Sequence, residues 1–471
     1  MNLSGHINQT LFYAIGEAAA ELQLEAYAIG GMVRDIVLDR PNKDFDFVTN
    51  GDGVLLAQQT AKKLGVKKVN VFKNFGTAQF RWGEVDLEFV GARKESYNKT
   101  SRKPDVMPGS LEDDQQRRDF TINAMAISLQ KENFGDLIDP FNGMSDLKNQ
   151  ILRTPLDPDI TYSDDPLRMM RAVRFANQLG FMIEENSFRA LSRNAERLKI
   201  VSMERIITEL NKIVLCAKPS RGFKILFDTG MLHQFFPEMV KLHGVEKKGG
   251  LSHKDNFYHT LQVLDNLCET TDSLWLRWSA ILHDIAKPAT KRFDPVLGWT
   301  FHGHEDLGAR MVPKIFARLK LPLDHHMKYV QKMVQLHLRP IALTKEEISD
   351  SAIRRLLFEA GDDVDDLMLL CKADITSKNE EKVKRYLHNY EIVKEKLIEV
   401  EKKDHIRNFQ PPVSGELIMN TFGIAPGREV GIIKNAIKDA ILDGIIHNDF
   451  QEAYAFMIDK GHEIGLQKLG N

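Results

Sequence analysis

The first third of the chain shows short apolar patterns that alternate between helix spacing and strand spacing. Apolar residues at helical spacing predict helices over residues 11–22, 32–38 and 54–64. Apolar runs and strict alternation predict strands over residues 26–29, 45–48, 69–72, 77–82 and 84–90. Strands and helices mixed in this way predict an α+β domain, which we place at residues 1–146.

The rest of the chain predicts helices almost throughout, because strand patterns nearly vanish from Leu147 onward. We expect a helical neck over residues 147–240, a helical body over residues 241–400 and a helical tail over residues 401–471. Residues 380–403 carry charges of both signs and predict a solvated helix.

Composition and charge narrow the class of protein. The chain has 471 residues and is 43% hydrophobic, which suffices for packed cores. It has neither a charged-then-apolar start nor an apolar run long enough to span a bilayer, so we expect a cytoplasmic protein without a membrane partner. The formal net charge is −2, so a nucleic-acid partner would require local basic patches. The three cysteines lie far apart and lack zinc-site spacing, which predicts reduced thiols.

A candidate phosphoryl-transfer site lies between residues 29 and 48. Asp44 and Asp46 are two residues apart on a predicted strand, so both carboxylates leave the same face. Such a pair suits Mg²⁺, which takes oxygen ligands and shares them with phosphates. Gly30 and Gly31 would let the backbone approach a triphosphate, and Arg34 lies about one helical turn further on. The alternative is an ordinary strand, turn and helix with a polar strand edge.

A third carboxylate is expected on the strand over residues 84–90. Asp86 and Glu88 share one face of this strand, and we place Asp86 opposite Asp44 and Asp46. Three carboxylates on adjacent strands match a two-metal arrangement, in which one ion activates the attacking hydroxyl and the other holds the leaving phosphates. A solvated polar face is the alternative reading of this strand.

Two polar segments follow the third carboxylate. Residues 93–116 contain helix breakers and predict a long loop, which in a compact domain is usually functional or disordered. Residues 117–126 are expected to open a helix, in which Arg117 and Arg118 would oppose the helix dipole. That unfavourable position indicates an anionic ligand for Arg118.

A basic ridge is expected on the first helix of the neck. The pattern predicts that this helix starts within residues 161–175, with an acidic cap and a proline in its first turn. Arg168, Arg171 and Arg174 recur every three residues and therefore share one face of this helix. A plain surface helix would intersperse acidic residues along such a ridge.

These segments together resemble the bacterial CCA-adding tRNA nucleotidyltransferases of class II, a poly(A) polymerase-like family, over nearly the whole chain. The matching parts are Gly30-Gly31 with Arg34, Asp44-Phe45-Asp46, Asp86, the block Arg117 to Ala124, and Asp164-Asp165-Pro166-Leu167-Arg168. The resemblance implies a polymerase-β-like palm followed by an all-α neck, body and tail. It also implies addition of C and A, or of one of them, to tRNA 3′ ends from CTP and ATP.

The resemblance further implies roles for individual residues. Asp44, Asp46 and Asp86 would be catalytic and would bind Mg²⁺. The expected nucleotide-binding residues are Gly31, Arg34, Arg118, Asp119, Asn123, Asp165, Arg168, Arg171 and Arg174. The tail would meet the tRNA, and no protein partner is inferred. Family members that add only C are expected to carry a shorter loop than residues 93–116, so the full length here favours CCA or A addition.

The chemistry of base choice supports the acidic and basic pair that the resemblance singles out. Cytosine and adenine both present an amino donor beside a ring-nitrogen acceptor, whereas uracil and guanine present a carbonyl acceptor beside a ring N–H. An ionised Asp165 can only accept and Arg168 can only donate, so the pair would take C or A. The wrong base would leave buried charged groups unpaired, which makes rejection strong.

A second motif set lies in the body and resembles the HD metal-dependent phosphohydrolases. There His259, His283, Asp284 and Asp374 would bind one divalent metal, and His304 and His337 could complete a binuclear site. Imidazole together with carboxylate suits a transition metal better than Mg²⁺. A vestigial domain with a structural role is the alternative.

Three rival functions stay open at this point. A bacterial poly(A) polymerase would share the palm and the neck, although the chain lacks the basic C-terminal extension that this reading prefers. An enzyme that adds only A or only C is the second rival. The third is an HD phosphohydrolase whose palm serves as a nucleotide sensor.

Overall fold

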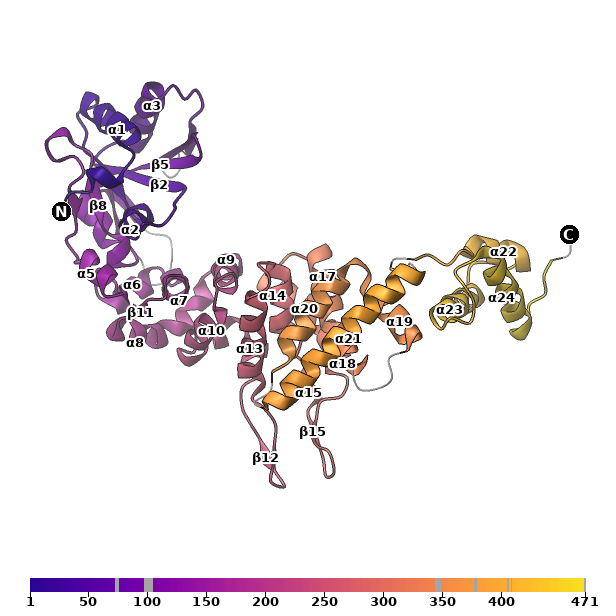
Figure 1. Ribbon diagram of the computed structural model, residues 1–471. Coiled ribbons are helices and arrows are strands. Elements are labelled where there is room, and N and C mark those ends of the chain that lie inside the picture. Colours follow the sequence, from indigo (N-terminus) through magenta and orange to yellow (C-terminus); the bar gives the residue numbers. More distant parts are fainter. Residues whose placement is uncertain are drawn as a thin grey trace. The chain divides into compact units, whose positions relative to one another are not determined.

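The computed structural model describes residues 1–72, 76–96, 105–343, 349–376, 379–404, 406–407 and 409–469. The chain forms two compact units, Met1–Val240 and Lys241–Asn471 (Figure 1). The division falls at one of the three predicted domain boundaries, and the other two boundaries stay predictions. Within the described ranges, no helix is both long and apolar enough to cross a membrane.

A seven-stranded mixed sheet forms the centre of the first unit, with strand order β3-β4-β5-β2-β1-β8-β9. The strands are β1 (Ala26–Ile29), β2 (Asp44–Thr49), β3 (Asn70–Phe72), β4 (Thr77–Trp82), β5 (Val85–Gly91), β8 (Ala126–Ser128) and β9 (Leu137–Ile138). Only β2 and β5 run parallel, and the other neighbours are antiparallel. The five predicted strands are confirmed within two residues at each end, and the α+β class is confirmed as well.

Alternation along β2 and β5 separates an aromatic face from a carboxylate face. Phe47 packs against Phe89 with ring centroids 5.1 Å apart and against Phe12 with centroids 5.6 Å apart. Phe12 belongs to α1 (Gln9–Glu21), which packs beside α3 (Gly53–Lys63). Because successive side chains of a strand point to opposite faces, this buried aromatic layer directs the acidic residues of both strands to the other face.

The segment over residues 93–116 is ordered where the structure describes it, so the prediction of a long irregular loop is wrong there. It forms β6 (Arg93–Ser96), β7 (Asp105–Pro108) and α4 (Leu111–Gln116). Ser110 starts α4 with a reciprocal cap to Asp113, which the sequence analysis overlooked. Residues 97–104 lie outside the described residues.

The helix expected to open at residues 117–126 does not form. Arg117 instead ends α4, Thr121–Asn123 forms one 3₁₀ turn, and β8 follows. The two arginines therefore lie at the C-terminal end of a helix, where the dipole favours positive charge. The argument for an anionic ligand from an unfavourable dipole no longer holds.

The first unit continues with short helices and one pair of short parallel strands. These are α2 (Gly31–Val37), α5 (Gly143–Lys148), β10 (Ile151–Leu152), α6 (Pro158–Asp164), α7 (Leu167–Leu179), β11 (Met182–Ile183), α8 (Glu185–Asn194), α9 (Met203–Val214), α10 (Pro219–Asp228), α11 (Met231–Phe235) and α12 (Pro237–Val240). The single helix predicted within residues 161–175 is divided between α6 and α7. Pro166 lacks a backbone N–H and cannot continue α6, but it can begin α7.

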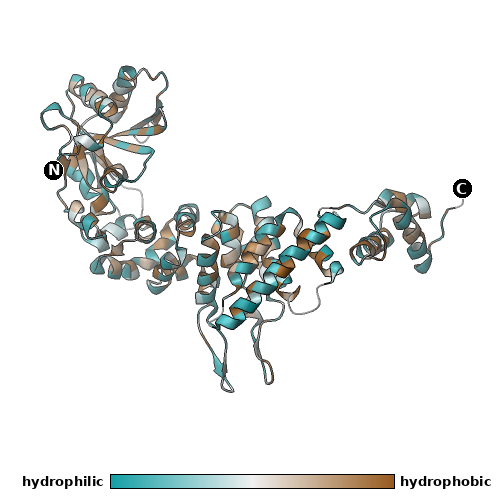
Figure 2. Ribbon diagram, in the orientation of Figure 1, coloured by the Kyte–Doolittle hydropathy of each residue, from teal (hydrophilic) through white to brown (hydrophobic). Residues whose placement is uncertain are grey.

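The second unit is largely helical, as predicted, with α14 buried at its centre. Its helices are α13 (Asn256–Cys268), α14 (Leu274–Leu282), α15 (Lys287–Thr290), α16 (His304–Leu319), α17 (His325–Leu336), α18 (Arg339–Leu343), α19 (Asp350–Ala360), α20 (Val364–Asp374), α21 (Glu380–Asp404), α22 (Gly415–Phe422), α23 (Arg428–Leu442) and α24 (Phe450–Glu463). Figure 2 shows hydrophilic residues along much of α21, interrupted by hydrophobic positions, as expected for a partly solvated helix.

Two hairpins in the second unit escaped the sequence analysis. They consist of β12 (Lys247–Lys248) with β13 (Leu251–Ser252) and of β14 (Arg292–Asp294) with β15 (Gly298–Thr300). Strands of two or three residues are too short to produce a recognisable alternation, which explains the omission.

Candidate active site and metal centre

The carboxylates of the first unit meet across the parallel pair of strands. Asp44 lies opposite Asp86, and Asp46 lies opposite Glu88. Glu88 lines a surface hollow together with Asp46, whereas Asp86 lies between Asp44 and Arg81 of β4 in the sheet register. The structure therefore makes Glu88 a candidate for the third carboxylate. The sequence analysis had placed Glu88 on the correct face of the strand but had chosen Asp86 for this role.

The electrostatics of Asp46 indicate a surplus of negative charge. Burial, together with the negative charges of Glu88 and Asp44, raises the pKa of Asp46 to about 6, and Arg118 opposes this effect. A cation that joins this carboxylate would lower its pKa and favour the ionised form. The donor set consists of carboxylate oxygens alone, which fits the oxygen preference of Mg²⁺.

Gly30 is required by both backbone conformation and space. Its φ is +88°, which L side chains rarely adopt, and a Cβ atom would lie 2.8 Å from Nη1 of Arg118 and 3.3 Å from Oδ2 of Asp46. The glycine therefore admits an arginine beside the carboxylates.

Arg118 is positioned by an acidic residue that the sequence analysis missed. Asp114 is fully buried and accepts hydrogen bonds from Nε and Nη2 of Arg118 at 3.1 and 3.0 Å. It also accepts from Nε of Arg117 at 2.9 Å. Although burial opposes ionisation, the two arginines lower the pKa of Asp114. One sequence signal could have indicated this role. Asp114 precedes Arg117 by three residues and Arg118 by four, and residues at these spacings are neighbours on a helix surface.

A second group of arginines surrounds one aromatic ring on α7. The guanidinium carbons of Arg34, Arg171 and Arg174 lie 5.0, 5.4 and 4.2 Å from the ring centroid of Phe175. Cations over an aromatic face are attracted to the ring electrons. Phe175 therefore holds three positive charges near one another, and the sequence analysis had not assigned it a role.

Acidic residues from other elements pair with the predicted basic ridge. Arg171 donates to Asp119 from Nε at 2.7 Å, and Arg174 lies 3.1 Å from Glu209 of α9. Although burial opposes it, Arg171 lowers the pKa of Asp119 to about 2. The α7 sequence itself supplies no acidic partners along the ridge, and other segments of the chain supply them instead.

Most of the predicted nucleotide-binding residues line one hollow. Arg34 donates from Nη1 to Asn123 at 2.8 Å, and Asn123 donates to Asp119 at 2.9 Å. The lining includes Gly31, Arg34, Asp44, Asp46, Arg118, Asp119, Asn123, Arg171, Arg174 and Phe175. The hollow therefore combines carboxylates for a metal ion with guanidinium groups for phosphates.

The predicted base-selecting pair lies beside this hollow and does not line it. Arg168 donates from Nη2 to the carbonyl of Arg117 at 2.6 Å and from Nη1 to that of Thr161 at 3.4 Å. Asp165 accepts from the backbone of Leu167 at 3.2 Å. The bond from Arg168 to Arg117 connects this arginine to the segment that carries Arg118.

In the second unit, backbone carbonyls orient the rings of three histidines in the same way, as is expected for metal ligands. Nδ1 of His283, His304 and His337 lies 2.7, 2.7 and 2.6 Å from the carbonyl three residues earlier. Each Nε2 is buried and, within the part of the chain that the structure describes, has no hydrogen-bond partner of acceptable geometry. Donation from Nδ1 leaves the lone pair on Nε2, as in metal-binding histidines.

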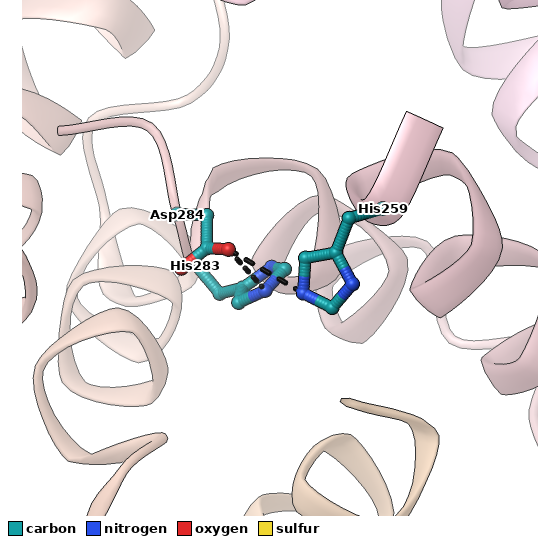
Figure 3. A group of neighbouring side chains, drawn as sticks. All are labelled: His259, His283 and Asp284. Carbon is teal, nitrogen blue, oxygen red and sulfur yellow. Dashed lines mark ion pairs between the residues drawn. The ribbon is translucent and has the colours of Figure 1, made fainter. Parts of the chain in front are cut away.

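Asp284 joins these histidines into two adjoining sets. Its Oδ2 lies 3.5 Å from Nε2 of His259 and 3.3 Å from Nε2 of His283. Figure 3 draws these ion pairs as dashed lines. Its Oδ1 lies 3.2 Å from Nε2 of His304 and 3.9 Å from Nε2 of His337. One carboxylate between two sets of imidazoles is the arrangement expected for a bridged pair of metal ions.

The remaining predicted ligand also reaches this cluster. Oδ1 of Asp374 lies 3.0 Å from Nε2 of His259 and 3.7 Å from Nε2 of His283. Burial lowers the pKa of His337 to about 3, so this imidazole is neutral. Although burial opposes it, the neighbouring His283 and Lys287 hold the pKa of Asp284 well below its ordinary value. The six residues fit a divalent transition metal in chemistry and arrangement.

The sheet, its carboxylates and the arginine-lined hollow define a polymerase-β-like nucleotidyltransferase, and the chain also contains a candidate metal site of the HD type. Family models agree, with a poly A polymerase head domain at residues 26–153, a probable RNA- and SrmB-binding site of polymerase A at residues 180–242 and an HD domain at residues 256–378.

Comparison with known proteins identifies the family. An A-adding tRNA nucleotidyltransferase of Deinococcus radiodurans is 30% identical over 92% of this chain and 94% of its own. A CC-adding tRNA nucleotidyltransferase of Thermus thermophilus is 29% identical over 92% and 93%. A tRNA nucleotidyltransferase solved with a primer tRNA and an incoming ATP analogue is 26% identical, with a TM-score of 0.56 over 81% of this chain and 99% of its own. The chain belongs to the tRNA nucleotidyltransferases.

Proposed function

We propose that the protein adds C, A or both to the 3′ end of tRNA, with CTP and ATP as donors and pyrophosphate as the second product. The observation that carries the proposal is the hollow in which Asp44 and Asp46 lie beside Arg118, Arg171 and Arg174. Relatives aligned over nearly their full length add A or CC to tRNA, which supports the same reaction class.

The reaction is a displacement at phosphorus. The 3′-oxygen of the tRNA forms a bond to the α-phosphorus, the bond from that phosphorus to the bridging oxygen breaks, and the hydroxyl proton passes to solvent. Asp44 and Asp46 would hold Mg²⁺, which neutralises phosphate charge and favours ionisation of the attacking hydroxyl. Arg118, Arg171 and Arg174 would bind the triphosphate, because guanidinium groups pair with phosphate oxygens.

We infer that Glu88 contributes the third carboxylate more directly than the expected Asp86. Glu88 is the register partner of Asp46 and lines a hollow with it, whereas Asp86 is the register partner of Asp44 and Arg81. Asp165 and Arg168 would read the base by the acceptor and donor pattern of cytosine and adenine.

The decisive experiment supplies labelled CTP or ATP with tRNAs that end before CCA, after the first C, or after CC. Incorporation of both nucleotides would identify complete CCA addition, and incorporation of one would identify an enzyme specific for C or A. Repeated addition of A to unrelated RNA would identify a poly(A) polymerase. Absence of incorporation with every substrate would overturn the proposed function.

A second function is supported by the six-residue cluster of the second unit. We propose that this cluster holds divalent transition metal and supports hydrolysis of a phosphoester. The supporting observation is the three buried Nε2 atoms around Asp284. Elemental analysis of protein purified without chelator should find Mn, Fe, Ni or Zn, and a metal-free result after reconstitution with each ion would refute the assignment.

A further inference from the structure

Phe175 of α7 lines the hollow that holds the carboxylates and arginines of the first unit, although its side chain has no group that donates, accepts or reacts. The residue is 6% exposed, and its ring meets the ring of Phe120 edge to face, with centroids 5.9 Å apart. Phe120 directly follows Asp119 in the chain. Packing against Phe120 therefore fixes the Phe175 ring beside the segment that carries Asp119.

The three guanidinium groups around this ring carry the same charge and are tied to separate segments. The ties run from Arg34 to Asp35 and Asn123, from Arg171 to Asp119, and from Arg174 to Glu209 of α9. Burial and the charges of the other two arginines lower the pKa of Arg174, and Glu209 opposes this effect. The guanidinium groups thus repel one another, so their proximity needs a further stabilising contact.

The Phe175 ring supplies that contact. A guanidinium group within about 6 Å of a ring centroid is attracted by the negative face of the ring. All three arginines meet this condition, at 5.0, 5.4 and 4.2 Å. The attraction is stronger at sites that are partly removed from water. A leucine in the same place could fill the space but would not attract the arginines.

We propose that Phe175 is a positioning residue, whose ring holds the three guanidinium groups together where the triphosphate of the incoming nucleotide binds. The inference deepens the proposed nucleotide addition and rests on it, because it concerns the same triphosphate. Phosphate oxygens that accept from these arginines would offset their charge and reduce the repulsion between them. Since the ring acts only through phosphate-binding groups, its contribution should be equal for CTP and ATP.

The test variant is Phe175→Leu, which keeps an apolar side chain and removes the aromatic face. Phe175→Tyr keeps the ring and should resemble the wild type. The matched control is Phe181→Leu, because Phe181 is buried in the same unit at 4% exposed. Within the described residues, no lysine or arginine lies over the ring of Phe181.

Phe175→Leu should raise KM about tenfold for each nucleotide that the enzyme incorporates, the size expected when cation–π contacts at partly buried sites are lost. The value of kcat should stay within about threefold and KM for tRNA within about twofold, because the carboxylates are untouched. Calorimetric titration of the full chain with inorganic tripolyphosphate, without Mg²⁺ or tRNA, should show a similar weakening in Phe175→Leu alone. This binding measurement is independent of turnover.

The outcomes separate this inference from the proposed nucleotide addition. If tripolyphosphate binding weakens in Phe175→Leu but the wild type incorporates no nucleotide into any tRNA, the proposed function fails and the positioning role stands. Unchanged binding and KM in a folded Phe175→Leu, equal weakening in Phe181→Leu, or weak binding in Phe175→Tyr overturns the role. Circular dichroism and Tm establish that the variants are folded. If Phe175→Leu does not fold, Phe175→Met, whose longer side chain fills more of the space, takes its place in the same measurements.

Discussion

The two candidate metal sites of this protein contain similar charges but differ in how they are built. In the first unit, carboxylates lie on the face of a sheet, Asp44 and Glu88 are exposed, and arginines line the adjoining hollow. In the second unit, His283, Asp284 and His337 are each 1% exposed and enclosed by helices. The open site suits metal ions that arrive with nucleotide phosphates, and the enclosed site suits ions that stay bound.

The difference extends to protonation. Burial and the neighbouring carboxylates raise the pKa of Asp46 to about 6, although Arg118 opposes them. In the second unit, backbone carbonyls orient Nδ1 of three histidines and leave Nε2 available for a metal. The fold therefore orients the candidate ligands of the second unit before any metal binds.

The largest expected effect is loss of nucleotide transfer in Asp46→Ala. Removal of this ligand should lower kcat by about three orders of magnitude or more, because metal ions supply much of the charge stabilisation in phosphoryl transfer. Single-turnover incorporation of labelled nucleotide measures the effect. Circular dichroism and the metal content of the second unit should match the wild type, and substantial activity would sink the metal assignment.

The next effect distinguishes the two candidates for the third carboxylate. Glu88→Ala should lower kcat by about a hundredfold, and Asp86→Ala should lower it less, because Glu88 is the residue that faces Asp46 across the strands. The measurement is kcat over a range of Mg²⁺ concentrations. The reverse order would assign the role to Asp86, as the resemblance implied.

The double variant His283→Ala/Asp284→Ala tests whether the two sites are independent. It should lose the metal of the second unit, because it removes a buried imidazole and the bridging carboxylate. Nucleotide addition should stay within about twofold of wild type, since the first unit has its own ligands. Elemental analysis and incorporation assays check both halves, and loss of both activities at an unchanged Tm would contradict independent sites.

A smaller effect is expected on base choice. Asp165→Ala should reduce discrimination against UTP and GTP by roughly 10- to 100-fold, because the variant no longer presents the acceptor for the amino group. The ratio of kcat/KM values for CTP and UTP measures this change. Arg193→Ala, which removes an exposed ion pair with Asp159 on neighbouring helices, serves as a control. Wild-type selectivity in Asp165→Ala would mean that the base is read elsewhere.

The smallest effect is a pH dependence of Mg²⁺ use in the first unit. Asp46 must be ionised to hold Mg²⁺, so the concentration for half-maximal transfer should rise about fourfold between pH 7.5 and pH 5.5. In the metal-free protein, the raised pKa of Asp46 affects folding stability in the opposite direction, because stability falls as pH rises. The folded state binds this proton more tightly than the unfolded state, so stability from Asp46 is lost as pH rises from about 4 to about 6. Asp46→Asn should abolish this part of the pH dependence of urea unfolding.

The sequence by itself determined the local elements and most of the residues of both candidate sites. Alternation in β2 and β5 separated Phe47 and Phe89 from the carboxylates, because side-chain direction in a strand depends only on position along that strand. The histidines and aspartates of the second unit were found differently, from the resemblance of their ordered motifs to the HD phosphohydrolases.

Tertiary structure alone decided which of these groups meet. Strand register places Glu88 and not Asp86 opposite Asp46, and packing turns Asp284 toward two sets of histidines. Burial of Asp114 and the position of Phe175 among three arginines also depend on contacts between distant segments. Local periodicity fixes the face on which a side chain lies, but the group that it faces depends on how separate elements pack together.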